Sequence, residues 1–280
     1  MRIINSEVIT KTVEEMCIDA NCHMTCDVKN AISDALKTEK SAVGCGILEN
    51  VLKNAEIADK REMPICQDTG MAVFFVEIGK EVFIEGDTIG DAINKGVALG
   101  YTNGYLRKSV VADPLKRVNT GDNTPAVIYY DFTDGDKIRI KFAPKGFGSE
   151  NKSALKMLTP ADGKDGIVDF VLATVEKAGS NPCPPMIVGV GIGGTMDKAA
   201  VLSKKALTRP IDTHNDDEYY AELEKELLEK VNKLGIGPQG MGGTTTALAV
   251  NIEKYPTHIA GLPLAVNISC HVTRHAEREI

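Results

Sequence analysis

The segment 63–70 (MPICQDTG) places a cysteine, a glutamine, an aspartate and a threonine side by side. A proline near its start and a glycine at its end predict a loop rather than the interior of a helix or strand. Polar side chains in a fixed order on a loop belong to functional sites more often than to cores. Taken alone, so short a motif still favours the plainer interpretation of a turn around one buried thiol, that of Cys66.

Two further cysteines lie in comparable surroundings later in the chain. Cys183 is part of the segment 180–185 (SNPCPP), whose three prolines make the backbone rigid and non-helical. Such rigidity is unusual around a thiol that only packs in a core and natural around a metal ligand. Cys270 follows an apolar stretch, 259–269, that predicts a strand. Cys66, Cys183 and Cys270 are therefore the candidate ligand set.

Three thiolate ligands predict a particular kind of iron–sulfur site. A cluster that only transfers electrons is held by four cysteines, so three ligands leave one iron with an open position. An open iron can act as a Lewis acid on a hydroxyl leaving group and on a carboxylate, where charge develops during a reaction. A binding or redox module that carries a cluster without such chemistry is the alternative.

The other four cysteines predict neither a disulfide framework nor a standard metal site. The total of seven is odd and unevenly spaced, and the first residues lack the features of a secretory signal. The spacing of Cys17, Cys22 and Cys26 matches no common zinc or ferredoxin pattern, so we expect core or loop thiols, with a local metal site as the weaker alternative. Cys45 falls on the apolar side of a predicted helix, and we expect it in the core.

The composition narrows the class of protein. The chain has 280 residues, of which 43% are hydrophobic and 25% charged, enough to bury a core as one large domain or as two lobes. The net charge of −7 and the lack of a basic run do not predict nucleic-acid binding. No apolar run is long enough to cross a membrane. We therefore expect a cytoplasmic protein without nucleic-acid or membrane partners.

Three glycine-rich segments interrupt the predicted elements. The segment 145–153 (KGFGSENKS) could cradle a carboxylate with its backbone amides, but it lacks the spacing of a nucleotide P-loop. Gly189, Gly191 and Gly194 formally match the dinucleotide-binding pattern, yet the acid expected about twenty residues further on would be Asp212, which no apolar strand precedes. A dinucleotide site is therefore a remote alternative. The third segment, 235–243, again predicts a loop.

Hydrophobic periodicity predicts an α+β fold, with helices around small, mainly antiparallel sheets. The clearest strand pair is a hairpin of 126–132 with 137–142, and a second pair joins 71–78 to 81–84. We expect a further strand over 186–190. The predicted helices cover 6–16, 27–36, 41–57, 88–105, 165–178, 195–207, 215–234 and 244–252.

Five motifs occur in a fixed order: 65–70 (ICQDTG), 145–153 (KGFGSENKS), 181–185 (NPCPP), 235–240 (GIGPQG) and 267–270 (NISC). Together they resemble the class I iron–sulfur fumarate hydratase and L-tartrate dehydratase family. The resemblance is strongest to the separate alpha subunit of the two-subunit form. It extends over essentially the whole chain, and the combination is far more specific than any one motif.

The resemblance implies a cofactor, a reaction and a set of site residues. The cofactor is a [4Fe–4S] cluster with three cysteine ligands and one open iron, and the reaction is reversible hydration of fumarate to S-malate. Residues 1–280 would form a single cluster-binding catalytic domain. The implied residues are Cys66, Cys183 and Cys270 as cluster ligands, Asp68 and His258 in catalysis, and Gln67, Arg107 and Gly146 in substrate binding.

The resemblance also implies partners. Single-chain relatives have a second half with further substrate-binding residues and a catalytic threonine, so we expect a separate beta subunit and a higher oligomer. The substrate would be a C4 dicarboxylate, with L-tartrate dehydratase as the alternative to fumarate hydratase. The general base stays open, because Asp68 could act directly or through a hydroxyl of the partner.

Overall fold

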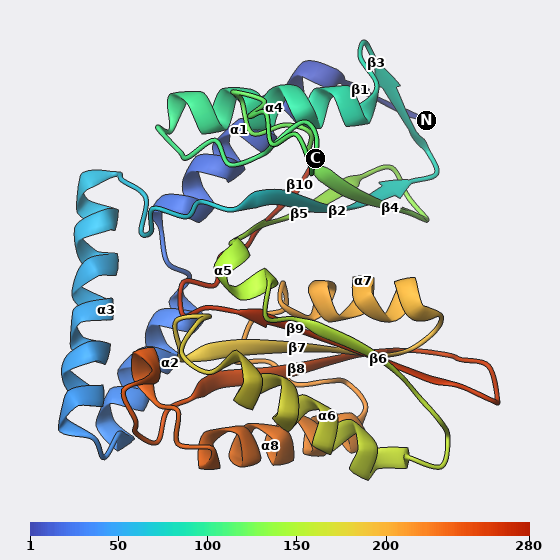
Figure 1. Cartoon of the computed structure of the whole chain (residues 1–280). Coiled ribbons are helices and arrows are strands. Elements are labelled where there is room, and N and C mark those ends of the chain that lie inside the picture. Colours follow the sequence, from blue (N-terminus) through green and yellow to red (C-terminus); the bar gives the residue numbers. More distant parts are fainter. The chain divides into compact units, whose positions relative to one another are not determined.

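Segments that lie far apart in the sequence combine into two units in the computed structural model, which describes residues 1–280 (Figure 1). Helix α3 (Ala42–Arg61) and the short helix α5 (Phe147–Glu150) contribute residues to both units. The first unit comprises Met1–Met24, Ala55–Phe147 and Arg274–Ile280, and the second comprises Thr25–Asn54 and Gly148–Thr273.

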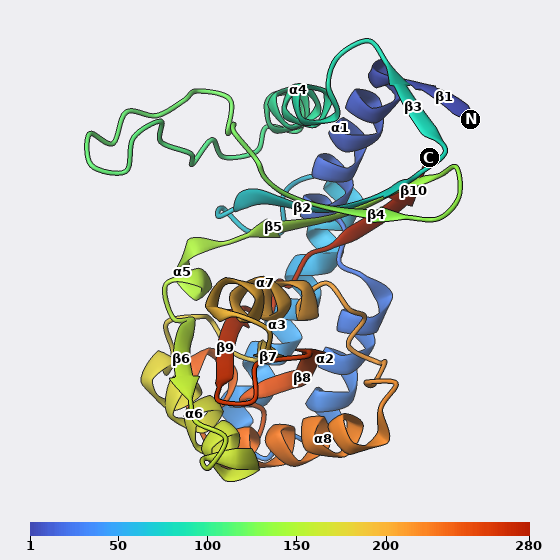
Figure 2. The ribbon, with the colours of Figure 1, turned by 90° about the vertical axis from the view of Figure 1, so that its right-hand side faces the viewer.

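The first unit contains two helices and six strands. These are β1 (Arg2–Asn5), α1 (Ser6–Cys22), β2 (Met71–Gly79), β3 (Val82–Glu85), α4 (Ile89–Asn103), β4 (Val127–Thr133), β5 (Ile138–Lys145) and β10 (Ala276–Glu279). A four-stranded sheet has the order β10-β5-β2-β4, and β1 and β3 form a separate parallel pair. Helices α1 and α4 pack against each other over one face of the larger sheet (Figures 1 and 2).

Helix α1 follows from its sequence. Asn5 caps the helix, because its side-chain oxygen accepts a hydrogen bond from the N–H of Glu7 at 2.8 Å. Ile9, Val13 and Met16 recur at helical spacing and are fully buried against the sheet. The helix extends beyond the predicted end at residue 16 and continues to Cys22.

The predicted hairpin of residues 126–132 and 137–142 is wrong, although both strands exist. Strand β2 lies between them, parallel to β4 and antiparallel to β5. The turn after β4 instead passes over the end of β2, where the N–H of Gly79 donates to the carbonyl of Lys137 at 2.8 Å. The predicted pairing of 71–78 with 81–84 is also wrong, because β3 pairs with β1. Local turn signals could not indicate that β2, a strand from earlier in the chain, lies between the two strands that flank the turn.

The second unit contains a four-stranded sheet in the order β6-β9-β7-β8, with helices on both faces. Helix α7 covers one face, and α6 and α8 cover the other (Figures 1 and 2). The elements are α2 (Cys26–Thr38), β6 (Ala154–Leu158), α6 (Gly163–Ala178), β7 (Met186–Gly193), α7 (Met196–Ala206), α8 (Glu218–Lys233), the 3-10 turn η1 (Pro238–Gly240), β8 (Ala247–Tyr255) and β9 (Leu262–Ser269).

Two glycines of the formal dinucleotide pattern belong to strand β7 and not to a phosphate-binding loop. A Cβ at Gly189 would lie 2.1 Å from the carbonyl oxygen of Ser203, and one at Gly191 would lie 2.1 Å from that of Ala199. These glycines therefore let helix α7 pack directly on the strand. The dinucleotide-binding interpretation is therefore not supported, because these glycines do not form a phosphate-binding loop.

The segment 244–252, which we expected to be a helix, forms most of strand β8. It pairs in parallel with β7, where Val188 lies opposite Val250. The length of a short apolar run does not by itself distinguish a buried strand from a buried helix. Its partner strand, more than fifty residues earlier, settles the conformation.

The α+β class is confirmed, and the sheets are mixed rather than mainly antiparallel. Of the seven strand pairings, three are parallel and four are antiparallel. None of the helices combines the length and the apolar character needed to cross a bilayer.

Candidate active site

The carboxylate of Asp68 is held by two main-chain donors on the first unit. Its Oδ1 accepts from the N–H of Gly70 at 3.0 Å, and its Oδ2 accepts from the N–H of Phe147 at 3.0 Å. Asp68 is partly exposed and lies three residues before strand β2 begins at Met71. Because main-chain donors fix both oxygens, the carboxylate has a defined orientation while remaining open to solvent.

The sheet register brings the loop 63–70 to the start of the segment 145–153. Met71 at the start of β2 lies opposite Lys145 at the end of β5. A Cβ at Gly146 would lie only 3.1 Å from Asp68 Oδ2, so glycine is what allows the backbone to approach the carboxylate. Gly70 has a φ of +74°, where a side chain would be strained, and a Cβ there would lie 2.7 Å from the N of Lys145.

Buried side chains bind the main-chain carbonyls of this loop from behind. The Tyr101 hydroxyl donates to the carbonyl oxygens of Thr69 at 2.8 Å and Gly70 at 3.1 Å. Burial raises the pKa of Tyr101 far above its ordinary value, so the hydroxyl keeps its proton. Arg274 Nη2 donates to the carbonyl oxygen of Asp68 at 2.8 Å. Three consecutive carbonyls therefore have fixed positions.

Arg107 is attached to the same loop through its backbone. Its N–H donates to the buried hydroxyl of Thr69 at 2.9 Å, and that hydroxyl lies 3.3 Å from the Arg107 carbonyl oxygen. The residue itself is exposed, as is Gln67. The structure thus gathers Gln67, Asp68, Arg107 and Gly146 on one unit.

Cys183 and Cys270 lie at the same end of the second unit's sheet. Strand β7 begins three residues after Cys183, and β9 ends one residue before Cys270, with Ile187 opposite Ser269. His271 joins the two segments, because its N–H donates to the carbonyl oxygen of Cys183 at 3.3 Å and its Nδ1 lies 2.8 Å from that oxygen.

The glycine-rich loop 235–243 reaches this end of the sheet as well. Gln239 donates from its main-chain N–H at 2.8 Å and from Nε2 at 2.9 Å, both to the carbonyl oxygen of Pro184. Its Nε2 also lies 3.2 Å from Nδ1 of His271. Three separate sequence motifs therefore meet around Cys183. Gln239 belongs to the motif 235–240, but the sequence indicated no role for Gln239 or for His271, since one polar residue in a loop indicates no particular contact.

Glu39 anchors the far side of that glycine-rich loop. Its carboxylate accepts from the N–H groups of Lys40 and Ser41, at 2.8 and 2.9 Å, and from those of Thr244 and Thr245 at distances from 2.8 to 3.0 Å. Burial raises the pKa of this carboxyl, but the hydrogen bonds from Ser41, Thr244 and Thr245 outweigh that effect and lower the pKa to about 2. Glu39 is therefore ionised in the folded protein.

The thiols fall into two groups by exposure. Cys17 and Cys22 are buried, and burial raises the pKa of both, which disfavours the thiolate that a metal requires. Cys45 is half-buried, with its thiol 3.6 Å from the carbonyl oxygen of Glu39, so the expectation of a core position is corrected. Cys26 is exposed at the start of α2.

The three predicted ligands are all at least partly accessible to solvent. Cys66 and Cys270 are partly exposed and Cys183 is exposed. Cys183 has a φ of +54°, a left-handed conformation that is rare for a residue with a side chain and that occurs most often at functional sites. Cys66 belongs to the first unit and the other two to the second. No three His, Cys, Asp or Glu side chains converge as ligands of a single metal ion. The donor set nonetheless fits a thiolate-ligated cluster in chemistry and accessibility.

His258 lies apart from these cysteines. It stands in the connection between β8 and β9, at the end of the sheet opposite Cys183 and Cys270. An eight-residue strand separates it from the Cys270 end, on the order of 25 Å at about 3.3 Å per residue. His258 instead lines a hollow of about 390 Å³ with Tyr219 and Leu262.

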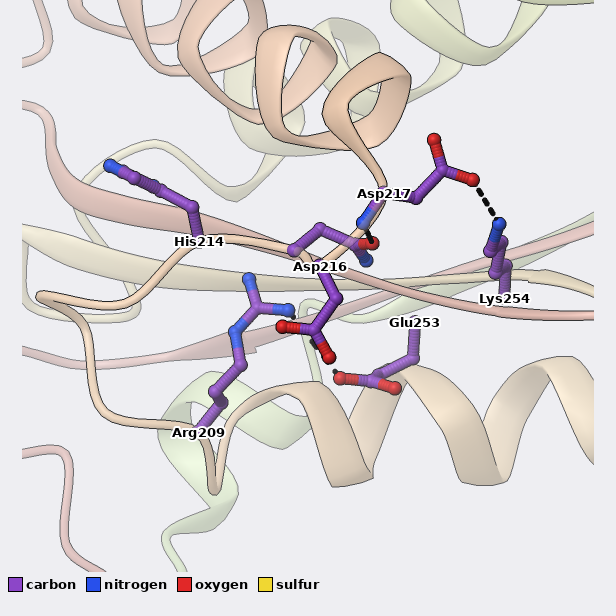
Figure 3. A pocket seen from close by; sticks show the side chains of 7 residues that line it. Arg209, His214, Asp216, Asp217, Glu253 and Lys254 are labelled. Atoms are coloured by element: carbon purple, nitrogen blue, oxygen red, sulfur yellow. Dashed lines mark hydrogen bonds and ion pairs between the residues drawn. The ribbon is translucent and has the colours of Figure 1, made fainter.

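A hollow of about 600 Å³ on the second unit is lined by charged residues, several of which are paired with one another (Figure 3). Arg209 forms ion pairs with the buried Glu224 and with Glu253, and Lys254 pairs with Asp217. Both of these cations are therefore neutralised by neighbouring carboxylates.

The comparisons with known proteins agree with the motifs. A protein family described as Fumarate hydratase (Fumerase) matches residues 10–279. The chain therefore belongs to the class I fumarate hydratase and L-tartrate dehydratase family of hydro-lyases.

Particular relatives cover almost the whole chain. A Methanocaldococcus jannaschii protein, provisionally named L(+)-tartrate dehydratase subunit alpha, is 45% identical over 278 residues, which are 97% of each chain. The L(+)-tartrate dehydratase subunit alpha of Escherichia coli K12 is 33% identical over 270 residues, covering 95% of this chain and 88% of the relative. The Shigella sonnei protein of the same name has the same identity and coverage.

Proposed function

We propose that this chain is the cluster-bearing alpha subunit of a hydro-lyase that acts on a C4 dicarboxylate. The observation that carries the proposal is the carboxylate of Asp68, fixed by two N–H donors two residues after the partly exposed Cys66. The position beside a thiol and the fixed orientation suit a group that transfers a proton at one defined atom of a substrate.

We propose Cys66, Cys183 and Cys270 as the ligands of a [4Fe–4S] cluster. When bound, such a cluster supplies a Lewis-acidic iron with an open position for a substrate hydroxyl and carboxylate. The left-handed backbone at Cys183, the exposure of this residue and the partial exposure of Cys66 and Cys270 support the assignment. None of the seven cysteines forms a disulfide, which suits a reducing, cytoplasmic compartment.

The other residues of the first unit have separate tasks in this proposal. The exposed guanidinium of Arg107 would bind one substrate carboxylate through a bidentate pair. The amide of Gln67 would contact the substrate, and the missing side chain at Gly146 leaves its backbone accessible. Asp68 would accept the proton from the substrate carbon during dehydration, directly or through a hydroxyl of the partner.

His258 can take part in catalysis only if other catalytic groups lie near it in the complete enzyme. Within the second unit it stands at the opposite end of the sheet from two of the cluster ligands. Its assignment to catalysis stays a prediction from the family resemblance. The relatives named as alpha subunits support a separate beta subunit, which would complete the active site. A higher oligomer built from both chains stays a prediction from the family resemblance.

The choice of substrate has two candidates. Fumarate and S-malate follow from the motif resemblance and the family description, while L-tartrate is favoured by the names of the relatives. The two hydroxy acids differ by one hydroxyl group. The test uses the complex of this chain with its beta subunit, prepared without oxygen. If fumarate hydration is the function, this complex should dehydrate malate with a higher kcat/KM than L-tartrate.

Two outcomes would change the assignment. Turnover of tartrate without turnover of malate would make the protein a tartrate dehydratase. Turnover of neither, together with a cluster spectrum that does not change when either acid is added, would favour a binding or redox module instead.

A further inference from the structure

Arg274 is a buried cation without a carboxylate partner. Its exposed fraction is 6%, and its guanidinium donates only to neutral oxygens: Nη1 to Asn21 Oδ1 at 2.9 Å and Nη2 to the carbonyl oxygen of Asp68 at 2.8 Å. Nε is buried and has no hydrogen-bond partner. A buried charge of this kind is costly. A neutral donor could bind the same oxygens, so the arrangement calls for an explanation beyond packing.

The position of the guanidinium relates it to the Asp68 carboxylate. A Cβ built on Gly146 would lie 3.1 Å from Asp68 Oδ2 and 3.8 Å from Arg274 Nη2. Both groups thus face the same glycine, although they form no direct ion pair. Arg274 fixes the main chain of Asp68 on one side, and the N–H groups of Gly70 and Phe147 fix its carboxylate on the other.

The side chain on helix α1 that binds the Arg274 guanidinium is itself held in position by hydrogen bonds. Asn21, which accepts from Nη1, donates from Nδ2 to the carbonyl oxygen of Cys17 at 2.8 Å within helix α1. The carbonyl oxygen of Asn21 accepts from the N–H of Ile65 at 3.0 Å. Helix α1 is therefore connected to the loop of Cys66 and Asp68 both directly and through the guanidinium.

We propose that Arg274 is a positioning residue, which acts through the Asp68 carbonyl to hold the Asp68 carboxylate against the N–H groups of Gly70 and Phe147. The inference rests on the proposed function, since it gives Asp68 a role in the reaction. A planar guanidinium can bind two oxygens on different segments at once, which a lysine ammonium does less well.

The kinetic test uses the complex of the full chain with its beta subunit. Arg274→Met should lower kcat about tenfold or more and leave KM nearly unchanged, because a misplaced catalytic group costs rate rather than binding. Arg274→Lys should recover part of that loss. In an Asp68→Asn background, Arg274→Met should have little further effect, because both changes remove the same contribution. Arg278→Met is the matched control, because Arg278 is half exposed and pairs with Asp19.

The proposal would be overturned by an unchanged kcat in Arg274→Met, or by losses that multiply in the double variant. Hydrogen exchange separates this outcome from a failure of the proposed function. Even in a complex that turns over no hydroxy acid, Arg274→Met should speed exchange of the amides of Gly70 and Phe147 relative to Arg278→Met. Equal exchange in the two variants would contradict the positioning role.

Discussion

The N–H of Phe147 donates to Oδ2 of Asp68 at 3.0 Å, although seventy-nine residues separate them in the sequence. This bond connects the loop that carries Cys66 to the glycine-bearing segment after strand β5. Gly146 lies between the end of β5 and Phe147. It therefore controls how close the backbone can come to the carboxylate.

Replacing Gly146 by alanine should lower activity more than stability. The new Cβ would lie 3.1 Å from Asp68 Oδ2, so the carboxylate must shift by a few tenths of an ångström. We expect kcat to fall about tenfold, because catalytic geometry tolerates little displacement. Gly148→Ala is the control, since its Cβ would lie 3.9 Å from the nearest atom, the carbonyl oxygen of Asn181. Equal kcat values in the two variants would show that the approach at Gly146 is not needed.

This contact also marks what the sequence could and could not predict. The two loops were recognised separately from their residue types, because prolines, glycines and polar side chains act locally. Their meeting depends on the pairing of β2 with β5, and local turn signals predicted a different partner for β5. Arg274 follows Cys270 by four residues, but the sequence alone indicated no role for it, because an arginine side chain is normally solvated. Only its burial and its two acceptors distinguish it.

Arg107 should contribute to substrate binding through its side chain alone. Its backbone N–H binds Thr69 in any variant, so Arg107→Met leaves the loop attached. We expect KM for the dicarboxylate to rise about tenfold or more with a smaller change in kcat, as for the loss of a ground-state carboxylate contact. Arg117→Met, on the same exposed connection, should behave as the unmodified protein. A KM unchanged by Arg107→Met would remove this residue from the binding site.

Glu39 should make stability depend on acid pH. Its pKa in the folded protein is about 2, below the ordinary value of 4.5, so its contribution is present above pH 4.5 and is lost as the pH falls towards 2. Glu39→Gln should cost on the order of 2 kcal/mol at neutral pH, because charge-assisted bonds to four N–H groups are weakened. Denaturant titrations at several pH values measure both effects.

The control for that experiment is Glu49→Gln, because Glu49 is exposed on helix α3. The difference in unfolding free energy between the Glu39 variant and this control should shrink between pH 5 and pH 2. A difference that stays constant over this range would mean that the Glu39 carboxylate does not carry the stabilisation.

Gly191 should tolerate no side chain, for reasons of packing. An alanine Cβ there would lie 2.1 Å from the carbonyl oxygen of Ala199, a main-chain atom of helix α7 that cannot move alone. Gly191→Ala should destabilise the second unit by about 3 kcal/mol or more, as expected for overpacking against backbone. Gly46→Ala, on helix α3 with open space around it, should raise the melting temperature slightly. Similar melting temperatures for the two variants would contradict this packing.

The measurement that tests the central claim most directly is iron and acid-labile sulfide per chain in protein purified without oxygen. The account predicts about four of each in the unmodified chain. Both should fall when Cys66, Cys183 or Cys270 is replaced by serine, and both should stay the same when the half-buried Cys45 is replaced. Protein that takes up no iron and sulfide after anaerobic reconstitution, or that loses them equally in the Cys45 variant, would contradict it.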